Sequence, residues 1–573
     1  MQQTTNGSPY LKTTLFLCLT ILLAWLWAWG RCASPFAVEC FINHDVFPND
    51  VAQSFVGWIS YLRSDSFIPP VFSSITWPYR SSAAYSDSIP IAAIASKILS
   101  KALHISKPFQ YFTALNLLNN LALIFLFRWF AIQFRLRSYI YGALALTVIF
   151  APCVLVRLTV HPFHANHFPI VASVILYSIG CRSLISWSLL SFLAIGMSIY
   201  YSPVVLSLYL GTLIITSKRN LLSSCSLFNQ PTAILKTFIV TVSPILASCV
   251  GFYIFGFNLP ADKTDPNSQI WDANIFTFIT PQGFFDEPRS ISAIVSRLSI
   301  DTPYEWEGNA YLGLTTIILL AVLLIHNLFH SAPASQERIG LSHVLMWKSS
   351  KYFWILPIVF FFFAIGPEWH AGQYHIFSLR KFFPFLYDNP LSLYAYFRAS
   401  GRFVWPIVYI TYIYCWTSLD LLDISSQKLR ALTYCLVALF LAETTLPLLS
   451  TVHKTNSRKY YQGLQEYEYI NELSSTVFSD VKDGDLILST GPKAYDRSIP
   501  PYVMPILPKT IATNYRAHVG RYPPSYLSDE KLGKDLFVQK HCELLLNYPG
   551  RIFFLKKRMD NQPYLSRLNI KSC

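Results

Sequence analysis

Charged residues are scarce in this chain, and acidic residues are scarcer than basic ones. Only 13% of its 573 residues are Asp, Glu, Lys or Arg, whereas 53% are hydrophobic. Soluble domains carry about 25% charged residues, so this composition excludes an ordinary soluble protein. Repeated apolar runs near the length of a membrane span instead predict a polytopic membrane protein.

Internal repeats, heptads and low-complexity stretches are also missing from the sequence. Many transporters have duplicated halves and functional charges near the membrane midplane, and neither is evident in these spans, which argues against transport. The formal net charge of +14 does not indicate nucleic-acid binding, because Lys and Arg are spread over short loops between apolar runs. We therefore expect no nucleic-acid partner, and the basic residues predict contact with membrane lipids.

The apolar runs predict about eleven transmembrane helices in a membrane domain that covers residues 1–450. The predicted spans lie at residues 11–30, 109–127, 138–156, 166–181, 184–200, 203–217, 233–256, 309–328, 352–366, 403–420 and 430–450. Residues 451–573 are richer in polar side chains, and strand-like runs at 485–490 and 551–557 predict a small α/β domain. The fold class is thus a polytopic α-helical membrane protein with a small C-terminal α/β domain.

Loop charges predict which side of the membrane each segment faces. With the N-terminus inside, every cytoplasmic loop is basic, which follows the positive-inside rule. The outer face then consists of loops 31–108, 257–308 and 367–402 together with the C-terminal domain. Within the first loop, residues 89–105 predict a helix along the membrane surface, with Lys97 and Lys101 on its polar side.

Two pairs of cysteines fall in segments that are predicted to lie outside the cytoplasm. Cys32 and Cys40 follow the first span, and Cys542 and Cys573 lie in the C-terminal domain. Disulfides persist in such compartments, so either pair could be bridged or reduced, and the sequence leaves both alternatives open.

An enzyme on the outer face has no ATP or nucleotide sugar, so it needs an activated donor from the membrane. Transfer from a lipid phosphate needs a carboxylate that takes the proton of the acceptor and cations that hold the phosphate. Our first candidate for this base is Asp50 in FPNDVAQSF, followed by Asp45 and then by Asp87 in YSDSIP. The alternative is that Asp50 and Asp87 each cap the helix that follows them.

Basic residues at two predicted membrane boundaries are candidates for phosphate binding. Arg157 ends the third span and precedes His161, His164 and His167, of which His161 is assigned to the phosphate and the other two to the sugar or acceptor. Histidines at this spacing could ligate zinc, but no paired carboxylate or cysteine signature accompanies them.

Two further arginines precede the span at 403–420. Arg398 and Arg402 in FRASGRFVWP lie one helical turn apart, and arginine grips phosphate oxygens bidentately. The alternative for Arg157, Arg398 and Arg402 is that each side chain anchors to lipid headgroups.

The segment YEWEGNAYLG at 304–313 combines aromatic rings with polar groups at the start of a span. Its Glu305, Glu307, Asn309 and Tyr311 are candidates for binding the sugar or acceptor, because sugar C–H faces pack on rings while hydroxyls bond polar groups. The alternative is an interfacial aromatic belt, which accounts for the rings but not for the glutamates.

The layout and these motifs resemble the GT-C class of membrane glycosyltransferases. An N-terminal helix, an acidic outer loop with a surface helix, many spans and an outer C-terminal domain carry the likeness. Within that class, NDVAQSFVGW, YSDSIP, residues 157–167, EGNAYLG and FRASGRFVWP resemble an uncharacterised bacterial inner-membrane family, over residues 35–410.

The resemblance implies inverting transfer of a sugar, such as glucose, from a polyprenyl-phosphate donor to a cell-surface glycan or glycolipid. O-antigen of lipopolysaccharide is one such acceptor, and the implied location is the bacterial cytoplasmic (inner) membrane with a periplasmic C-terminal domain. The base of that class lies in the first outer loop, which matches Asp50 and then Asp45. No cofactor is implied, and a divalent cation stays open. Alternative functions are a flippase of lipid-linked sugars and an O-antigen polymerase or ligase.

Overall fold

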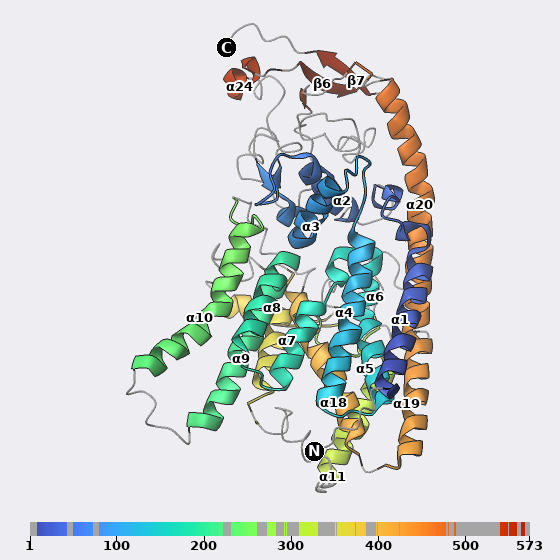
Figure 1. Cartoon of the computed structure of the whole chain (residues 1–573), viewed down its shortest axis with the longest axis vertical. Coiled ribbons are helices and arrows are strands. Elements are labelled where there is room, and N and C mark those ends of the chain that lie inside the picture. Colours follow the sequence, from blue (N-terminus) through green and yellow to red (C-terminus); the bar gives the residue numbers. More distant parts are fainter. Residues whose placement is uncertain are drawn as a thin grey trace.

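The computed structural model gives the arrangement of most of the chain. It describes residues 8–42, 50–72, 80–221, 231–259, 272–281, 292, 294, 309–329, 350, 352–372, 374–384, 397, 399–422, 424–476, 479–480, 486–488, 539–547, 549, 551–557 and 563–567. Most of these residues are helical, and the helices run along the long axis of the molecule (Figure 1).

The described residues form α-helices and a few short 3₁₀ and π turns. The α-helices are α1 (Ser8–Trp29), α2 (Asp50–Arg63), α3 (Pro90–Ala102), α4 (Phe112–Gln133), α5 (Ser138–Ile149), α6 (Pro152–Val160), α7 (Phe168–Ser178), α8 (Leu184–Met197), α9 (Tyr201–Leu221), α10 (Pro231–Ile254), α11 (Leu314–Phe329), α14 (Ile355–Ile365), α15 (Leu379–Phe382), α18 (Trp405–Asp420), α19 (Ser426–Phe440), α20 (Leu446–Ser475) and α24 (Cys542–Leu546). Short 3₁₀ turns are η1 (Gly30–Ala33), η2 (Val38–Phe41), η3 (Ala83–Ser86), η4 (Pro162–Ala165) and η9 (Ser400–Val404), and η10 (Leu441–Thr445) is a π-turn.

Strands are few and form three small sheets. Antiparallel pairs join β1 (Val71–Phe72) to β2 (Ser81–Ser82) and β3 (Glu368–Ala371) to β4 (Tyr374–Ser378). The third sheet has the order β5 (Leu486–Leu488), β6 (Ile552–Lys557) and β7 (Pro563–Arg567), with one parallel and one antiparallel pair. Strands β5 and β6 coincide with the two strand-like runs of the predicted C-terminal α/β domain.

Each of the predicted spans overlaps a helix, but most of these helices are short. Within the described residues, three helices are long and apolar enough to cross a bilayer, at Pro9–Ala33, Phe112–Gln133 and Ser426–Gln465. Helices α5 and α6 pass the same test only as a pair, which bends by 44° because Pro152 cannot donate the next helical hydrogen bond, as in a broken span or a re-entrant loop. The 11 residues of α7 or α14 extend only about 16 Å, about half of the hydrocarbon core.

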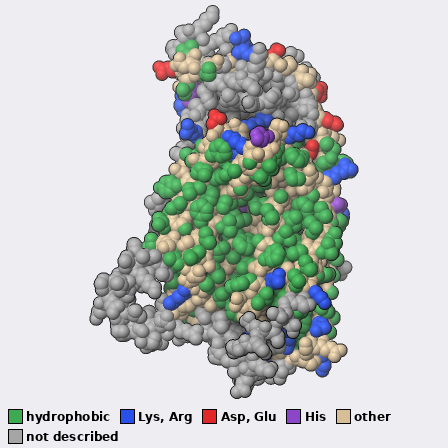
Figure 2. All heavy atoms as spheres, viewed as in Figure 1, with side chains coloured by type: hydrophobic (Ala, Val, Ile, Leu, Met, Phe, Trp, Pro, Cys, Tyr) green, Lys and Arg blue, Asp and Glu red, His purple; other side chains and the backbone are tan. Residues whose placement is uncertain are grey.

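The surface of the bundle is apolar around its middle. Figure 2 shows a broad belt of hydrophobic side chains, with Lys and Arg above and below the belt and Asp and Glu at the upper end. On α1 the exposed face carries Leu15, Phe16 and Leu23, each between 57% and 62% exposed. Large apolar side chains exposed in such a belt are typical of a surface in contact with lipid, so the protein associates with a membrane.

The longest continuous helical segment joins the bundle to the upper end of the molecule. Helix α19, the turn η10 and helix α20 follow one another without a break, and α20 lies beside α1 (Figure 1). The predicted boundary between residues 450 and 451 therefore falls inside α20, which continues to Ser475. Asn456 Nδ2 donates a 3.0 Å hydrogen bond to the Ala28 carbonyl, which ties α20 to α1.

The segments α2 and α3 lie together above the bundle (Figure 1). Helix α3 is the predicted surface helix, but Lys97 does not face solvent as predicted, since its side chain is fully buried. Its Nζ donates to the carbonyls of Tyr61, Ser64 and Ser66 at 2.6–2.7 Å, and burial lowers its pKa to about 8. The Lys97 ammonium group therefore holds the end of α2 and the segment that follows it in place.

The loop that follows α1 also carries a disulfide. Cys32 and Cys40 are bonded, which settles the first of the two pairs that the sequence left open. Cys542 is disulfide-bonded as well, and Cys573 lies outside the described residues.

Candidate functional site

The short helix α6 delivers Arg157 and three histidines to one buried place. Arg157 lies in the last turn of α6, and η4 and the start of α7 follow with His161, His164 and His167. All four side chains are between 1% and 4% exposed. We call these four residues, with Arg402, the basic cluster.

Arg402 reaches the cluster from a distant part of the chain. It lies in η9, directly before α18, and its Nη1 donates a 3.1 Å hydrogen bond to Nε2 of His164. The guanidinium also stacks on the ring of Tyr200, with its Cζ 4.3 Å from the ring centroid. The structure therefore brings Arg402 to His164, while the predicted roles of these residues stay predictions, and Tyr200 was missed.

The hydrogen bond to Arg402 fixes the state of His164. A guanidinium only donates, so Nε2 of His164 accepts and the ring is neutral. Burial, and then the charge of Arg402, lower the pKa of His164 well below its ordinary value, in agreement with that state. His164 therefore acts at neutral pH as a polar, uncharged wall of the cluster.

Asp87 is the carboxylate that the described structure brings to the cluster. Its Oδ1 lies 3.8 Å from Nε2 of His164, which is too long for a hydrogen bond. Whereas the His164 side chain is 4% exposed, that of Asp87 is 40% exposed, so the carboxylate borders open space. The interpretation of Asp87 as a helix cap is wrong, because Ile89 occupies the cap position of α3 and Asp87 follows η3 in a left-handed conformation.

The chain around Asp87 is linked to α2 through a hydrogen bond of Ser88. The hydroxyl groups of Ser86 and Ser88 lie 2.6 Å apart, and Ser88 Oγ donates to the Ser54 carbonyl at 2.7 Å. Gly57 allows this approach, because a Cβ there would lie 1.8 Å from Ser86 Oγ. NDVAQSFVGW and YSDSIP therefore form one packed unit that positions Asp87.

An aromatic wall closes the cluster on the side of α18. The Cζ of Arg157 lies 5.5 Å from the ring centroid of Trp405, and the His167 ring packs on the same indole at 4.4 Å. Nδ1 of His167 is hydrogen-bonded to the Tyr409 hydroxyl, and Tyr201 donates to the His164 carbonyl at 3.0 Å. Trp405, Tyr409 and Tyr201 were not predicted, because an aromatic residue in an apolar run is usually core.

Asp272 is a second carboxylate near the site that sequence reasoning missed. Its Oδ1 accepts a 2.5 Å hydrogen bond from Ser400 Oγ, two residues before Arg402. Burial raises the pKa of Asp272 well above its ordinary value. Gly366 packs directly on this carboxylate, since an added Cβ there would meet its Oδ2 at 2.3 Å. The local signal in the sequence is the WDAN segment of residues 271–274.

Several predicted residues fall outside the described part of the structure. Asp50 begins α2, but its side chain is not among the described ones, so its predicted role as base stays a prediction. The same holds for the roles of the residues that lie wholly outside the described ranges, which are Asp45, Arg398, Glu305 and Glu307.

Tyr311 does not reach the basic cluster through the contacts described. Its hydroxyl donates to Oε1 of Glu443 at 2.5 Å, and this carboxylate also accepts from Ser292 Oγ and from the Leu314 backbone N–H. Asn309 accepts from the Tyr311 backbone N–H at 3.4 Å. Glu443 is fully buried in η10, inside a candidate span.

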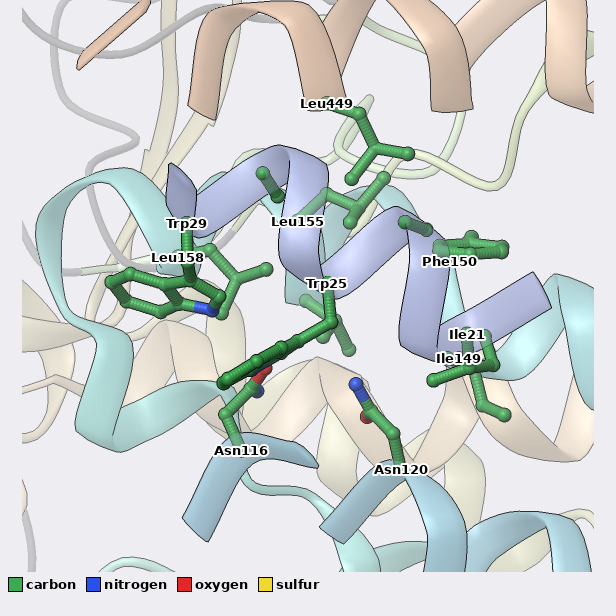
Figure 3. Close-up of a pocket in the computed structure, with 13 residues that line it drawn as sticks. Ile21, Trp25, Trp29, Asn116, Asn120, Ile149, Phe150, Leu155, Leu158 and Leu449 are labelled. Carbon is green, nitrogen blue, oxygen red and sulfur yellow. The ribbon is translucent and has the colours of Figure 1, made fainter. Parts of the chain in front are cut away.

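A pocket lies on the other side of α6. Figure 3 shows Asn116 and Asn120 of α4 and Trp25 of α1 extending towards it, and the cavity volume is about 20 Å³, close to that of one water molecule. Most of its lining is apolar, and Val154, Leu155 and Leu158 of α6 contribute to it. One short helix therefore separates an apolar pocket from the basic cluster.

The cluster is suited to an anion. Arg157 and Arg402 are only 1% and 7% exposed, and Arg402 donates a hydrogen bond to the neutral ring of His164. Buried guanidinium groups bind phosphate oxygens strongly, because the surrounding medium screens the charges weakly. Asp87 adds a partly exposed carboxylate at the same place, which can accept a proton.

One comparison with known proteins identifies the family. A family described as a domain of unknown function (DUF6311) matches residues 17–444, about three quarters of the chain, so the chain belongs to it. No curated protein and no solved structure matches the chain.

Proposed function

We propose that this member of the DUF6311 family is a membrane glycosyltransferase that moves a sugar from a polyprenyl-phosphate donor to a cell-surface glycan such as O-antigen. The observation that carries the proposal is the meeting of buried Arg157 and Arg402 with partly exposed Asp87. An anion site beside a carboxylate is what transfer from a lipid phosphate requires.

The two arginines bind the phosphate of the donor. They approach from α6 and from the start of α18, so their guanidinium groups can hold different oxygens of one phosphate. The neutral imidazole of His164 supports Arg402 and does not compete with it for the anion.

Asp87 acts as the base in this reaction. The hydroxyl oxygen of the acceptor attacks the anomeric carbon, the bond from that carbon to the phosphate oxygen breaks, and the hydroxyl proton passes to the Asp87 carboxylate. The bond electrons leave with the phosphate, whose charge the arginines stabilise, and the attack inverts the anomeric configuration. Asp50 is the alternative base, as the family resemblance implies.

The site faces the outside of the bacterial inner membrane in this proposal. The Cys32–Cys40 disulfide supports that orientation, since disulfides persist in oxidising compartments and this one follows α1 at the same end as α2. The eleven predicted spans, a cytoplasmic N-terminus and a periplasmic C-terminal domain belong to the same proposal. In this proposal, the helices that are too short to span the bilayer alone cross it in pairs or enter it only part of the way.

Complementation of a gene deletion tests the proposal. Mass spectrometry of the surface glycan is expected to show one hexose per repeat lost in the deletion and restored by the wild-type chain. Asp87→Asn is expected to leave the protein in the membrane without restoring the hexose, whereas Asp65→Asn, an exposed carboxylate beyond α2, restores it. Full restoration by Asp87→Asn with loss in Asp50→Asn would move the role of base to Asp50.

The same experiment separates the alternative functions. A polymerase deletion collapses the glycan ladder on a gel, whereas loss of a side-branch transferase shifts every band slightly. Flipping of lipid-linked sugars by the purified chain in liposomes, with no transfer to an acceptor, would contradict the proposal.

A further inference from the structure

A short antiparallel hairpin beside the candidate site exposes apolar side chains on both of its faces. Strands β3 and β4 form a ribbon that α15 follows, and the Ile275 N–H donates to the His370 carbonyl of β3 at 3.1 Å. Tyr374 is 69% exposed, Ile376 58%, Phe382 64% and Phe383 45%. Large apolar side chains that gather on an exposed surface indicate contact with a membrane or a partner.

A column of aromatic rings joins this hairpin to the apolar face of α14. The Trp369 ring stacks on Phe362 at 5.4 Å and packs on Phe377 at 5.5 Å, and Phe377 stacks on Phe382 at 5.4 Å. On α14, the residues Ile355, Ile358, Val359 and Phe362 are 46–53% exposed. The exposed apolar surface of the bundle therefore continues without a break into the hairpin.

Polar groups of the hairpin gather at its base and at its end. The Glu368 carboxylate accepts hydrogen bonds of 2.8 Å from Nε2 of His375 and from Oγ of Ser378. These two bonds hold the strands in register. Arg380 and Lys381 lie in α15, next to the exposed rings. Aromatic rings with adjacent cations are the combination found at the boundary between hydrocarbon and headgroups.

The base of the hairpin is fixed to the candidate site. Gly366 connects α14 to β3 and packs on the Asp272 carboxylate, which accepts the hydrogen bond from Ser400, two residues before Arg402. The Leu379 N–H also donates to the Pro367 carbonyl at 2.8 Å, so α15 is closed back onto the same turn. The position of the hairpin relative to Arg402 is therefore rigid.

We propose that the hairpin at residues 368–383 is an interfacial anchor that inserts its exposed rings and Ile376 into the bilayer surface, with Arg380 and Lys381 at anionic headgroups. The occupant of this surface is lipid, because its apolar face is continuous with the apolar belt of the bundle. The anchor sets the depth of the basic cluster relative to the headgroups, and it does not depend on the reaction that the cluster performs.

Photolabelling in lipid nanodiscs tests this proposal. The full chain is placed in discs of phosphatidylethanolamine and phosphatidylglycerol, a fraction of which carries a diazirine on the acyl chain, and lipid adducts are mapped by mass spectrometry. Adducts are expected on residues 374–383 at a yield similar to that on residues 355–362 of α14. The polar end of α20, residues 468–475, serves as the aqueous control.

Two variants sharpen the test without touching the core. Ile376→Glu, at a side chain that is 58% exposed, is expected to reduce hairpin adducts to the level of the aqueous control while α14 stays labelled. Replacing Arg380 and Lys381 by Gln is expected to lower the adduct yield roughly fivefold per charge, and only when anionic lipid is present.

Unlabelled residues 374–383 beside a labelled α14 would overturn the proposal. So would crosslinks from the hairpin to a second copy of the chain without lipid adducts, since they would assign the surface to a dimer. Loss of glycosyl transfer has no bearing on either outcome, so failure of the anchor and failure of the proposed function are distinguishable.

Discussion

Replacement of Gly57 by Ala tests how α2 positions Asp87. In an isolated helix, replacing glycine by alanine stabilises the helix by about 1 kcal/mol, because alanine loses less backbone conformational freedom on folding than glycine does. Here an added Cβ would lie 1.8 Å from Oγ and 2.4 Å from Cβ of Ser86, so the chain that carries Asp87 must shift. The packing argument and the helix-propensity argument therefore predict opposite signs.

The magnitude follows from the contacts that the shift disrupts. Overpacking costs about 1–3 kcal/mol, and the hydrogen bonds from Ser86 to Ser88 and from Ser88 to Ser54 contribute about 1 kcal/mol each. After subtraction of the helix-propensity gain, Gly57→Ala is expected to destabilise the protein by about 3 kcal/mol. Transfer is expected to be lost as well, because Asp87 lies between the two serines.

Thermal unfolding of the purified protein in nanodiscs measures this effect. Gly142→Ala in α5 is the matched control, because its added Cβ would lie 3.3 Å from a single methyl group, and it is expected to change stability by less than about 1 kcal/mol. The double variant Gly57→Ala with Ser86→Gly removes the closest contacts and is expected to recover part of the loss. An unfolding temperature of Gly57→Ala at or above that of the wild type would refute the packing argument.

Three further changes have defined outcomes. Gly366→Ala is expected to lower the free energy of unfolding by about 3 kcal/mol, because Gly366 has a φ of +75° and an added Cβ would meet Asp272. An unfolding temperature equal to that of the wild type would contradict this prediction. The pKa of His164 is lowered on folding, so as the pH falls the unfolded chain takes up the proton before the folded chain does. The contribution of His164 to stability is therefore complete above about pH 6.5 and falls by about 1.4 kcal/mol per pH unit below it. His164→Gln is expected to reduce this slope in unfolding experiments between pH 7 and pH 5, and an unchanged slope would contradict the assignment. Replacing Cys32 and Cys40 by Ser opens a loop with a sequence separation of 8 and is expected to cost about 2.5 kcal/mol in denaturant unfolding, whereas no loss would show that the bridge adds nothing.

Much of the fold was predictable from local sequence. Every predicted span coincides with a helix, because long apolar runs are a local signal, and the strands at 486–488 and 552–557 follow from β-branched and aromatic runs. The lengths were less predictable, since Pro152 breaks one predicted span into α5 and α6 and the last span continues through α20. Helix length depends on tertiary packing as well as on composition.

The site was predictable only in part, because its contacts are distant in sequence. Arg157 and Arg402 were found from their chemistry at membrane boundaries, whereas Tyr200 was not, since nothing near an aromatic residue shows that it will stack on a guanidinium. Asp87 ranked third among the candidate bases, and its sequence also resembles a helix cap. The left-handed backbone between two buried serines, which excludes that interpretation, depends on packing against α2.

Binding of a polyprenyl phosphate to the purified protein in nanodiscs tests the central claim most directly. Arg157→Gln and Arg402→Gln are each expected to weaken binding about tenfold or more, because each removes charged hydrogen bonds to the phosphate. Asp87→Asn is expected to bind as the wild type does, since asparagine tolerates the left-handed backbone, while transfer falls about 100-fold or more. Wild-type binding by both arginine variants, or transfer at the full rate by Asp87→Asn, would contradict the account.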